Sequence, residues 1–188
     1  MNIGTRNFKL CDLQWITFAA MSLLVIGSVA FDAIETPFGK TDKIIGGAAT
    51  YISLSSSYFT DQVKLVAVVG GDFPKEDIKL LEDHGVDTEG LQIKEDEKSF
   101  FWSGKYHNDM NSRDTLVTEL NVLENFDPIL PASYQSSEYV MLGNLSPNVQ
   151  RKVIERMDTK PKLIALDTMN FWMDIALEEL HKTIAMVD

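Results

Sequence analysis

A strand, a lone acid, a glycine pair and a helix follow one another in residues 23–59, and this order constrains the fold more than any other part of the chain. The apolar run Leu23–Ile26 is typical of a buried strand, and Asp32 follows it after small and apolar residues. Gly46 and Gly47 then precede a run of small residues that indicates a helix packed closely on a sheet. Paired glycines before a helix can present backbone N–H groups to a ligand.

Each of these signals alone has an ordinary structural explanation. A single Asp after a strand more often caps a helix or forms a turn, and a Gly-Gly pair is usually a turn. Their succession favours the rim of an open α/β sheet, where ligands usually bind. The alternation of strand and helix patterns along the rest of the chain predicts a Rossmann-like, mostly parallel sheet with helices on both faces.

The remaining elements are expected from apolar periodicity, capping residues and turn residues. The expected strands of the main sheet are Val63–Val69, Tyr139–Leu142 and Lys162–Leu166. The expected helices are Lys75–His84, a helix from Pro147 to about Met157, and Phe171–Ile184. Three short segments rich in aromatic and β-branched residues predict a small separate sheet: Gly90–Ile93, Ser99–Tyr106 and Thr115–Leu120.

Three strings, GSVAFD, IIGGAATYISLSSSYF and LVAVVGGDFP, resemble the amino-terminal half of the ribokinase-like, or PfkB, carbohydrate kinases. The resemblance implies a ribokinase-like fold with a small β lid, at about residues 90–120, that closes over the substrate and often pairs with a second lid in a homodimer. It also implies that Asp32, Gly46 and Gly47 hold hydroxyl groups of a sugar or nucleoside. Tyr51 stands where many members have an asparagine, which leaves the identity of the substrate open.

Further candidate residues have both a functional and a structural interpretation. Asn144 follows a predicted strand and lies on the expected binding rim. Asp167 and Asn170 loosely fit a D-x-N pattern that is common in the family. The alternative for Asp167 and Asn170 is that they cap the last helix. Phe100, Phe101 and Trp102 form either the core of the small sheet or a lid wall that faces a sugar or a partner subunit. Arg113, in the polar connector between two lid strands, either reaches the ligand or is solvated.

The resemblance implies phosphoryl transfer from ATP, with Mg2+, to a substrate hydroxyl. The family takes its catalytic base and anion hole from a GAGD loop, which this sequence lacks, and its nucleotide loops are also absent. We therefore expect the acceptor side of such a kinase without the donor side, and assign no catalytic residue, cofactor-binding residue or metal ligand. The alternative is a non-catalytic sugar-binding or interaction protein built on the same lobe.

Composition excludes several other classes of partner. Lys and Arg total 17 against 28 Asp and Glu, and the net charge of −11 repels nucleic acid and anionic lipid. The single cysteine, Cys11, cannot form an internal disulfide, and the three histidines lie far apart in the sequence, so a cytoplasmic location without structural zinc is the simplest interpretation.

The amino terminus contains a segment, Leu13–Phe31, without charged side chains, which superficially matches an export signal or membrane span. Polar residues interrupt it, and its second half is the first expected strand. We therefore interpret residues 1–20 as an extension, residues 21–188 as the amino-terminal part of a PfkB-type kinase domain, and expect no membrane partner.

Overall fold

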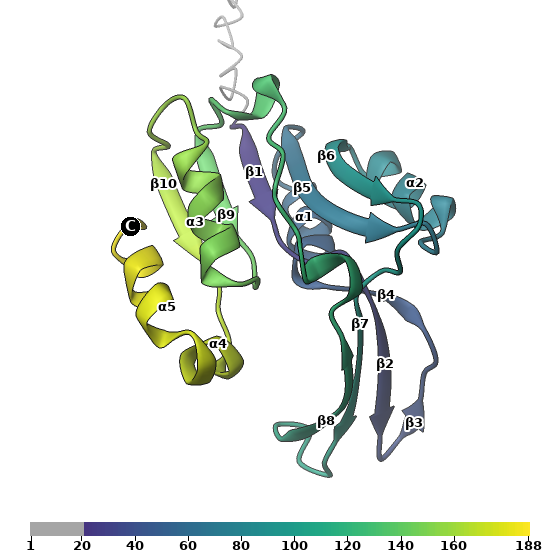
Figure 1. Cartoon of the computed structure of the whole chain (residues 1–188). Coiled ribbons are helices and arrows are strands. Elements are labelled where there is room, and N and C mark those ends of the chain that lie inside the picture. The colour runs from purple at the N-terminus through teal and green to yellow at the C-terminus, as the bar shows by residue number, and fades with distance from the viewer. Residues whose placement is uncertain (1–20) are drawn as a thin grey trace, which may run out of the picture.

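The computed structural model describes residues 21–188, so the interpretation of residues 1–20 lies outside the described part of the chain. These residues form a five-stranded main sheet and a smaller sheet that projects beyond the carboxyl ends of its strands (Figure 1). Helices pack on both faces of the main sheet. The predicted fold class is therefore confirmed.

The main sheet has the strand order β10-β9-β1-β5-β6, and every neighbouring pair is parallel. Its strands are β1 (Leu23–Ile26), β5 (Val63–Gly70), β6 (Val86–Lys94), β9 (Tyr139–Leu142) and β10 (Leu163–Leu166). The central strands β1 and β5 are almost continuously apolar and buried, as parallel strands covered on both faces must be.

Five helices are described in residues 21–188: α1 (Ala48–Ser56), α2 (Lys75–Asp83), α3 (Pro147–Glu155), α4 (Asn170–Ile175) and α5 (Leu177–Ile184). The predicted start of α3 is confirmed, because the Ser146 side chain accepts a hydrogen bond from the Val149 N–H and Pro147 takes the first helical position. The single helix predicted over Phe171–Ile184 is wrong. Ala176, at φ −141° and ψ 33°, leaves the helical region and separates α4 from α5.

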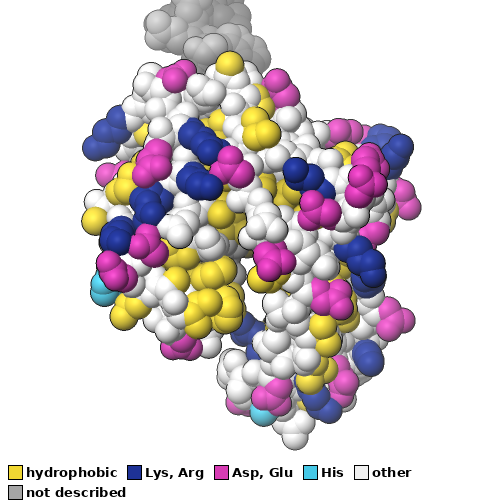
Figure 2. Space-filling view, in the orientation of Figure 1, with side chains coloured by type: hydrophobic (Ala, Val, Ile, Leu, Met, Phe, Trp, Pro, Cys, Tyr) yellow, Lys and Arg dark blue, Asp and Glu magenta, His cyan; other side chains and the backbone are white. Residues whose placement is uncertain are grey.

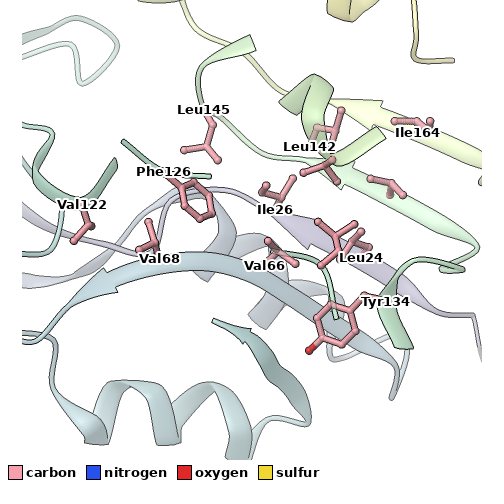
Figure 3. Packing of buried hydrophobic residues seen from close by; sticks show 13 residues of the cluster. Leu24, Ile26, Val66, Val68, Val122, Phe126, Tyr134, Leu142, Leu145 and Ile164 are labelled. Atoms are coloured by element: carbon pink, nitrogen blue, oxygen red, sulfur yellow. The ribbon is translucent and has the colours of Figure 1, made fainter. Parts of the chain in front are cut away.

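The core consists of two clusters, one on each face of the main sheet. Helices α1 and α2 pack on one cluster through Ala49, Ile52, Ile78 and Leu81. The other cluster lies under α3 and under residues 121–138, which run across the sheet as an irregular segment with short 3-10 turns at Asn121–Leu123 and Ala132–Tyr134 (Figure 3). Tyr134 anchors this segment, because its buried hydroxyl donates to the Asp87 carbonyl at 2.9 Å.

The smaller sheet, called the lid below, is larger than predicted. Its strands are β2 (Ala30–Thr36), β3 (Gly39–Lys40), β4 (Ile44–Gly46), β7 (Phe101–Tyr106) and β8 (Arg113–Glu119). The order is β3-β2-β7-β8, with β4 also paired to β2. Residues 30–46 were not predicted to belong to it. Gly90–Ile93 was expected in the lid but lies in β6 of the main sheet, paired in parallel with β5.

Candidate functional site

Asp32 lies inside the lid strand β2, close to the place where the chain leaves the main sheet after β1. It was expected at the edge of the main sheet after a single strand; instead, β1 ends at Ile26 and the chain enters β2 at Ala30. Asp32 is directly opposite Ile44 of β4 and is in register with Trp102 of β7. The acid is therefore held by pairing on both sides at the base of the lid.

The predicted glycine pair lies directly against this acid. A Cβ atom at Gly46 would stand 2.2 Å from Asp32 Oδ2 and 2.4 Å from Asp32 Cγ, so the carboxylate occupies the space that a side chain at 46 would need. Gly47 has φ +93°, and a Cβ there would stand 2.3 Å from the Ser28 carbonyl oxygen. The close approach of Asp32 therefore favours glycine at position 46. At position 47, glycine is favoured both by the positive φ and by the close approach of the Ser28 carbonyl oxygen.

Burial raises the pKa of the Asp32 carboxyl, while a hydrogen bond from the Gly47 backbone amide offsets part of that rise. The carboxylate is therefore poorly solvated. A carboxylate in this condition gains more from a charge-assisted hydrogen bond to a ligand hydroxyl than one that is already surrounded by water.

Ser28 holds the amino terminus of α1 beside the acid, and sequence reasoning missed it. Its Oγ accepts a hydrogen bond from the Ala48 N–H at 3.0 Å, and its carbonyl oxygen accepts one from the Ala49 N–H at 2.9 Å. The first amides of α1 are therefore bonded to the protein itself. A serine directly after a buried strand was the available signal, but serine is common in such turns.

Tyr51 and Asn144 lie near the same helix start. Tyr51 is in α1, 56% exposed, and its hydroxyl approaches the Ile45 carbonyl oxygen at 3.4 Å. Asn144 follows Gly143, whose amide donates to the Ile26 carbonyl at 2.7 Å and whose Cβ position would lie 3.5 Å from the Ala48 Cβ. The structure thus brings the ends of β1 and β9 together at the start of α1.

The side chain of Asn144 is engaged with the segment that carries Asn170. Its Oδ1 accepts a hydrogen bond from Trp172 Nε1 at 2.9 Å, and its Nδ2 lies 3.0 Å from Met169 Sδ. Asn170 is exposed at the first position of α4, and the N-cap is Met169, so the alternative that Asp167 or Asn170 caps the helix is wrong. Asn144 therefore links α4 to the rim through Trp172, and Asn170 at the start of α4 is exposed there.

Gln150 is a second residue that sequence reasoning missed. It is fully buried on α3, and its Nε2 lies within hydrogen-bond distance of the Leu142, Gly143 and Asp167 carbonyls, at 3.3, 2.9 and 2.9 Å. It ties the carboxyl ends of β9 and β10 together beneath the rim. Its signal was the spacing Pro147, Gln150, Val153, which puts a polar residue on the buried face of a helix.

The two lid candidates differ in where they lie. Phe101 is in register with Phe31, on the face of the lid that packs against the core of the main sheet, and Lys43 Nζ lies 5.7 Å from its ring centroid. It is not on the Asp32 face. Arg113 is the first residue of β8, not part of a loop, and its guanidinium carbon lies 5.8 Å from the Trp102 ring centroid.

Asp72, in the turn after β5, joins the main sheet to the lid. Burial acts to raise the pKa of its carboxyl, but hydrogen bonds from Ser99 and the charge of Lys43 outweigh burial and lower it. The Ser99 backbone N–H donates to Asp72 Oδ1 at 2.7 Å, just before β7 begins. Asp72, in the string Gly70-Gly71-Asp72, therefore acts as a turn and packing element.

Among residues 21–188, no three side chains of His, Cys, Asp and Glu gather in a way that could hold a metal ion. No helix in that range is both long enough and apolar enough to cross a membrane.

Comparison with known proteins gave matches in sequence and in structure, although no family model matches the chain. It is 31% identical over 148 residues to a cytidine kinase of Thermococcus kodakarensis, an alignment that covers 78% of this chain and 51% of that kinase. The chain thus spans about half the length of this curated relative.

Two solved structures share the fold. The nucleoside kinase of Methanocaldococcus jannaschii, described as an archaeal member of the ribokinase family, superposes with a TM-score of 0.67 at 18% identity over 90% of this chain and 60% of its own. The nucleoside kinase of Burkholderia thailandensis in complex with inosine gives a TM-score of 0.67 at 13% identity over 88% of this chain and 58% of its own.

Proposed function

We propose that this chain, which belongs to the ribokinase-like (PfkB) family of carbohydrate kinases, binds the hydroxyl groups of a nucleoside or sugar at Asp32 and the Gly46–Gly47 pair. The observation that carries the proposal is the close approach of the Asp32 carboxylate to Gly46. It places the acid beside the glycine backbone that leads into α1. Two hydroxyls on neighbouring carbons can donate to the two oxygens of one carboxylate. Such charge-assisted hydrogen bonds contribute about 1.5–3 kcal/mol.

The other rim residues complete the proposed acceptor site. Tyr51 is exposed beside the glycine pair, and Asn170 is exposed on α4, which Asn144 holds in position. A nucleoside is favoured as the acceptor, because the curated relative is a cytidine kinase and one structural neighbour was solved with inosine. The proposal includes a cytoplasmic location and a homodimer formed through the lid.

ATP and Mg2+ are the partners expected for a kinase of this family. The described residues do not gather a set of metal-ligating side chains, and the printed sequence has no GAGD loop. Positioning an acceptor hydroxyl without groups that stabilise the moving phosphoryl group leaves out the interactions that strengthen in the transition state. We therefore propose that the chain binds the acceptor and does not by itself transfer phosphate.

Titration calorimetry of the 188-residue chain with cytidine, inosine and D-ribose tests the proposal. We expect saturable binding of at least one nucleoside, weakened roughly tenfold or more by Asp32→Ala. Asp42→Ala is the matched control, since Asp42 is an exposed acid in the loop between β3 and β4. Equal affinities for the parent and Asp32→Ala would remove Asp32 from the site.

A coupled assay separates binding from catalysis. With ATP, Mg2+ and the nucleoside that binds, we expect no ADP release above the rate without nucleoside. ADP release that depends on both substrates and is lost in Asp32→Ala would show that a complete catalytic site lies within these residues. It would also exclude the alternative of a non-catalytic binding protein.

A further inference from the structure

Trp102 shares the Asp32 face of the lid. In the parallel pair β2 and β7, Asp32 is in register with Trp102, whereas Phe31 is in register with Phe101. Because successive residues of a strand point to opposite faces, Asp32 and Trp102 project on one side and the two phenylalanines on the other. Phe31 and Phe101 pack against the core of the main sheet, so Trp102 is the aromatic residue of this part of β7 that faces the acid.

The indole ring of Trp102 lies against Gly104. A Cβ atom at Gly104 would stand 2.1 Å from Trp102 Cη2 and 2.4 Å from Trp102 Cζ2, so the ring fills the space above that glycine. Trp102 Nε1 lies 3.4 Å from Thr115 Oγ1 on the neighbouring strand. The strand pairing shifts by one residue between Ser103 and Gly104, and such irregularities commonly re-aim side chains.

The position of the ring relative to Asp32 fits a ligand that consists of a sugar and a planar base. The indole starts one strand spacing from Asp32, about 4.8 Å, and extends over two residues of β7, roughly 6.6 Å, toward the tip of the lid. A ribose bonded to Asp32 with its base directed toward the tip of the lid would place that base beside the indole ring. The benzene part of the ring, at Cη2, Cζ2 and Cζ3, lies against Gly104, and the exposed Arg113 guanidinium carbon lies 5.8 Å from the ring centroid.

We propose that the Trp102 indole stacks on the planar base of a nucleoside whose ribose is held at Asp32, and that Trp102 therefore selects nucleosides over free sugars. The proposal rests on the proposed function and names its substrate class. Arg113 is exposed and its guanidinium carbon lies 5.8 Å from the ring centroid, so its side chain is free to make room for the base. Because every base has an aromatic face, stacking discriminates weakly between cytidine and inosine. It discriminates strongly between either nucleoside and D-ribose, which has no such face.

Calorimetry with cytidine, inosine and D-ribose on the full chain tests this with three variants. Trp102→Leu removes the aromatic face and Trp102→Phe retains one. Phe38→Leu is the control, because Phe38 is an 85% exposed lid aromatic in the turn between β2 and β3, away from Asp32. Thermal unfolding of each variant reports whether the lid still folds.

We expect Trp102→Leu to weaken both nucleosides about tenfold, within the range known for base–aromatic stacking, and to change D-ribose affinity less than twofold. Trp102→Phe should retain most of the nucleoside affinity, and Phe38→Leu all of it. Unchanged nucleoside affinity in Trp102→Leu, or an equal loss for D-ribose, overturns the stacking role while leaving Asp32 binding intact. If the parent chain binds no nucleoside and no ribose, the proposed function itself fails and the stacking role fails with it.

Discussion

At the scale of single residues, Asp32 has a carboxylate that is largely removed from water. Within residues 21–188, the Gly47 backbone amide offsets part of this burial, and no cationic side chain does so. Because burial raises its pKa above 3.8, the native state binds the proton more tightly than the unfolded state does. The ionised form therefore costs stability. The cost is absent at low pH, where the group is protonated in both states, and grows as pH rises from 3.8 through the folded pKa.

The first prediction is that Asp32→Asn stabilises the protein at pH 7 while weakening nucleoside binding. Removal of the buried charge should raise Tm by a few degrees, as expected for a position optimised for binding at the expense of stability. Thermal unfolding between pH 3 and pH 8 would measure this, with the exposed Asp42→Asn as control. A difference that stays constant over this pH range would contradict the assignment to ionisation.

The second prediction concerns three glycines whose surroundings differ. Gly39→Ala should change the free energy of unfolding by less than about 0.5 kcal/mol, because nothing lies within 4 Å of its Cβ position. Gly85→Ala should cost about 1–2 kcal/mol for its φ of +77° alone. Gly47→Ala should cost more than about 2 kcal/mol, because φ is +93° and the Ser28 oxygen also blocks the site. Urea denaturation gives the order, and a Gly47 cost below that of Gly85 would contradict it.

Sequence alone indicated the acid and the glycine pair because both lie between a strand pattern and a helix pattern within residues 23–59. It indicated Phe100, Phe101 and Trp102 together as lid aromatics but not which of them faces the acid, because the pairing of Asp32 with Trp102 joins positions 70 residues apart. Phe101 was predicted as the site residue. Since a shift of one residue reverses the face of every side chain in a strand, this choice depended on information that only the folded lid contains.

At the scale of elements, α4 is attached to the rim mainly through one side chain. It has six residues, all exposed or only partly buried, and the Asn144–Trp172 hydrogen bond links it to the end of β9. A helix this short has little stability of its own. The break at Ala176, which no Gly or Pro marks in the sequence, separates it from α5, and this is why one continuous helix was predicted there.

The third prediction is that Asn144→Ala loosens α4 without unfolding the domain. Loss of the acceptor leaves the Trp172 indole N–H without its partner, at a cost of about 1 kcal/mol. Amide hydrogen exchange in residues 170–175 should quicken about fivefold, while β1 and β5 remain protected. Asn148→Ala removes an exposed hydrogen bond to Arg151 and serves as control. Unchanged exchange in α4 would show that Asn144 does not fix this helix.

Local sequence patterns predicted only part of the lid. Strands β7 and β8 were expected near their observed positions, because both are rich in aromatic and β-branched residues. The β2–β4 segment was not expected, since its Asp, Gly and Lys residues are typical of a loop. It forms strands because β2 pairs with β7, a distant partner that supplies the hydrogen bonds.

At the scale of the whole molecule, apolar side chains gather on the surface over α4 and α5 (Figure 2). The exposed members are Phe171, Met173, Ile175, Leu177, Ile184 and Met186. The same view shows the surface hollowed between this region and the lid. Contiguous apolar surface of this kind commonly mediates association.

The fourth prediction is that the chain self-associates at micromolar concentration. Sedimentation velocity should show species larger than a monomer, and the double substitution Met173→Ser with Ile175→Ser should remove the species larger than the lid-mediated dimer. Phe59→Ser removes an 85% exposed aromatic elsewhere and should have no effect. If the lid mediates the dimer, Leu116→Ser in the exposed strand β8 will have the larger effect. A monodisperse parent monomer would contradict the prediction.

The position of β1 at the centre of the main sheet has a consequence for how the chain folds. β1 pairs on one side with β5, where Leu23 faces Val63, and on the other with β9, where Leu23 faces Tyr139. The second pairing closes a loop nearly three times as long, and long loops cost more entropy before their contacts form. We therefore expect β1, β5 and β6 to assemble first and β9 to dock late, an order that pulse-labelled hydrogen exchange during refolding would reveal. Until β9 docks, one edge of β1 has unpaired backbone groups that can pair with another chain. Slow docking of β9 therefore lengthens the period in which the refolding chain can aggregate.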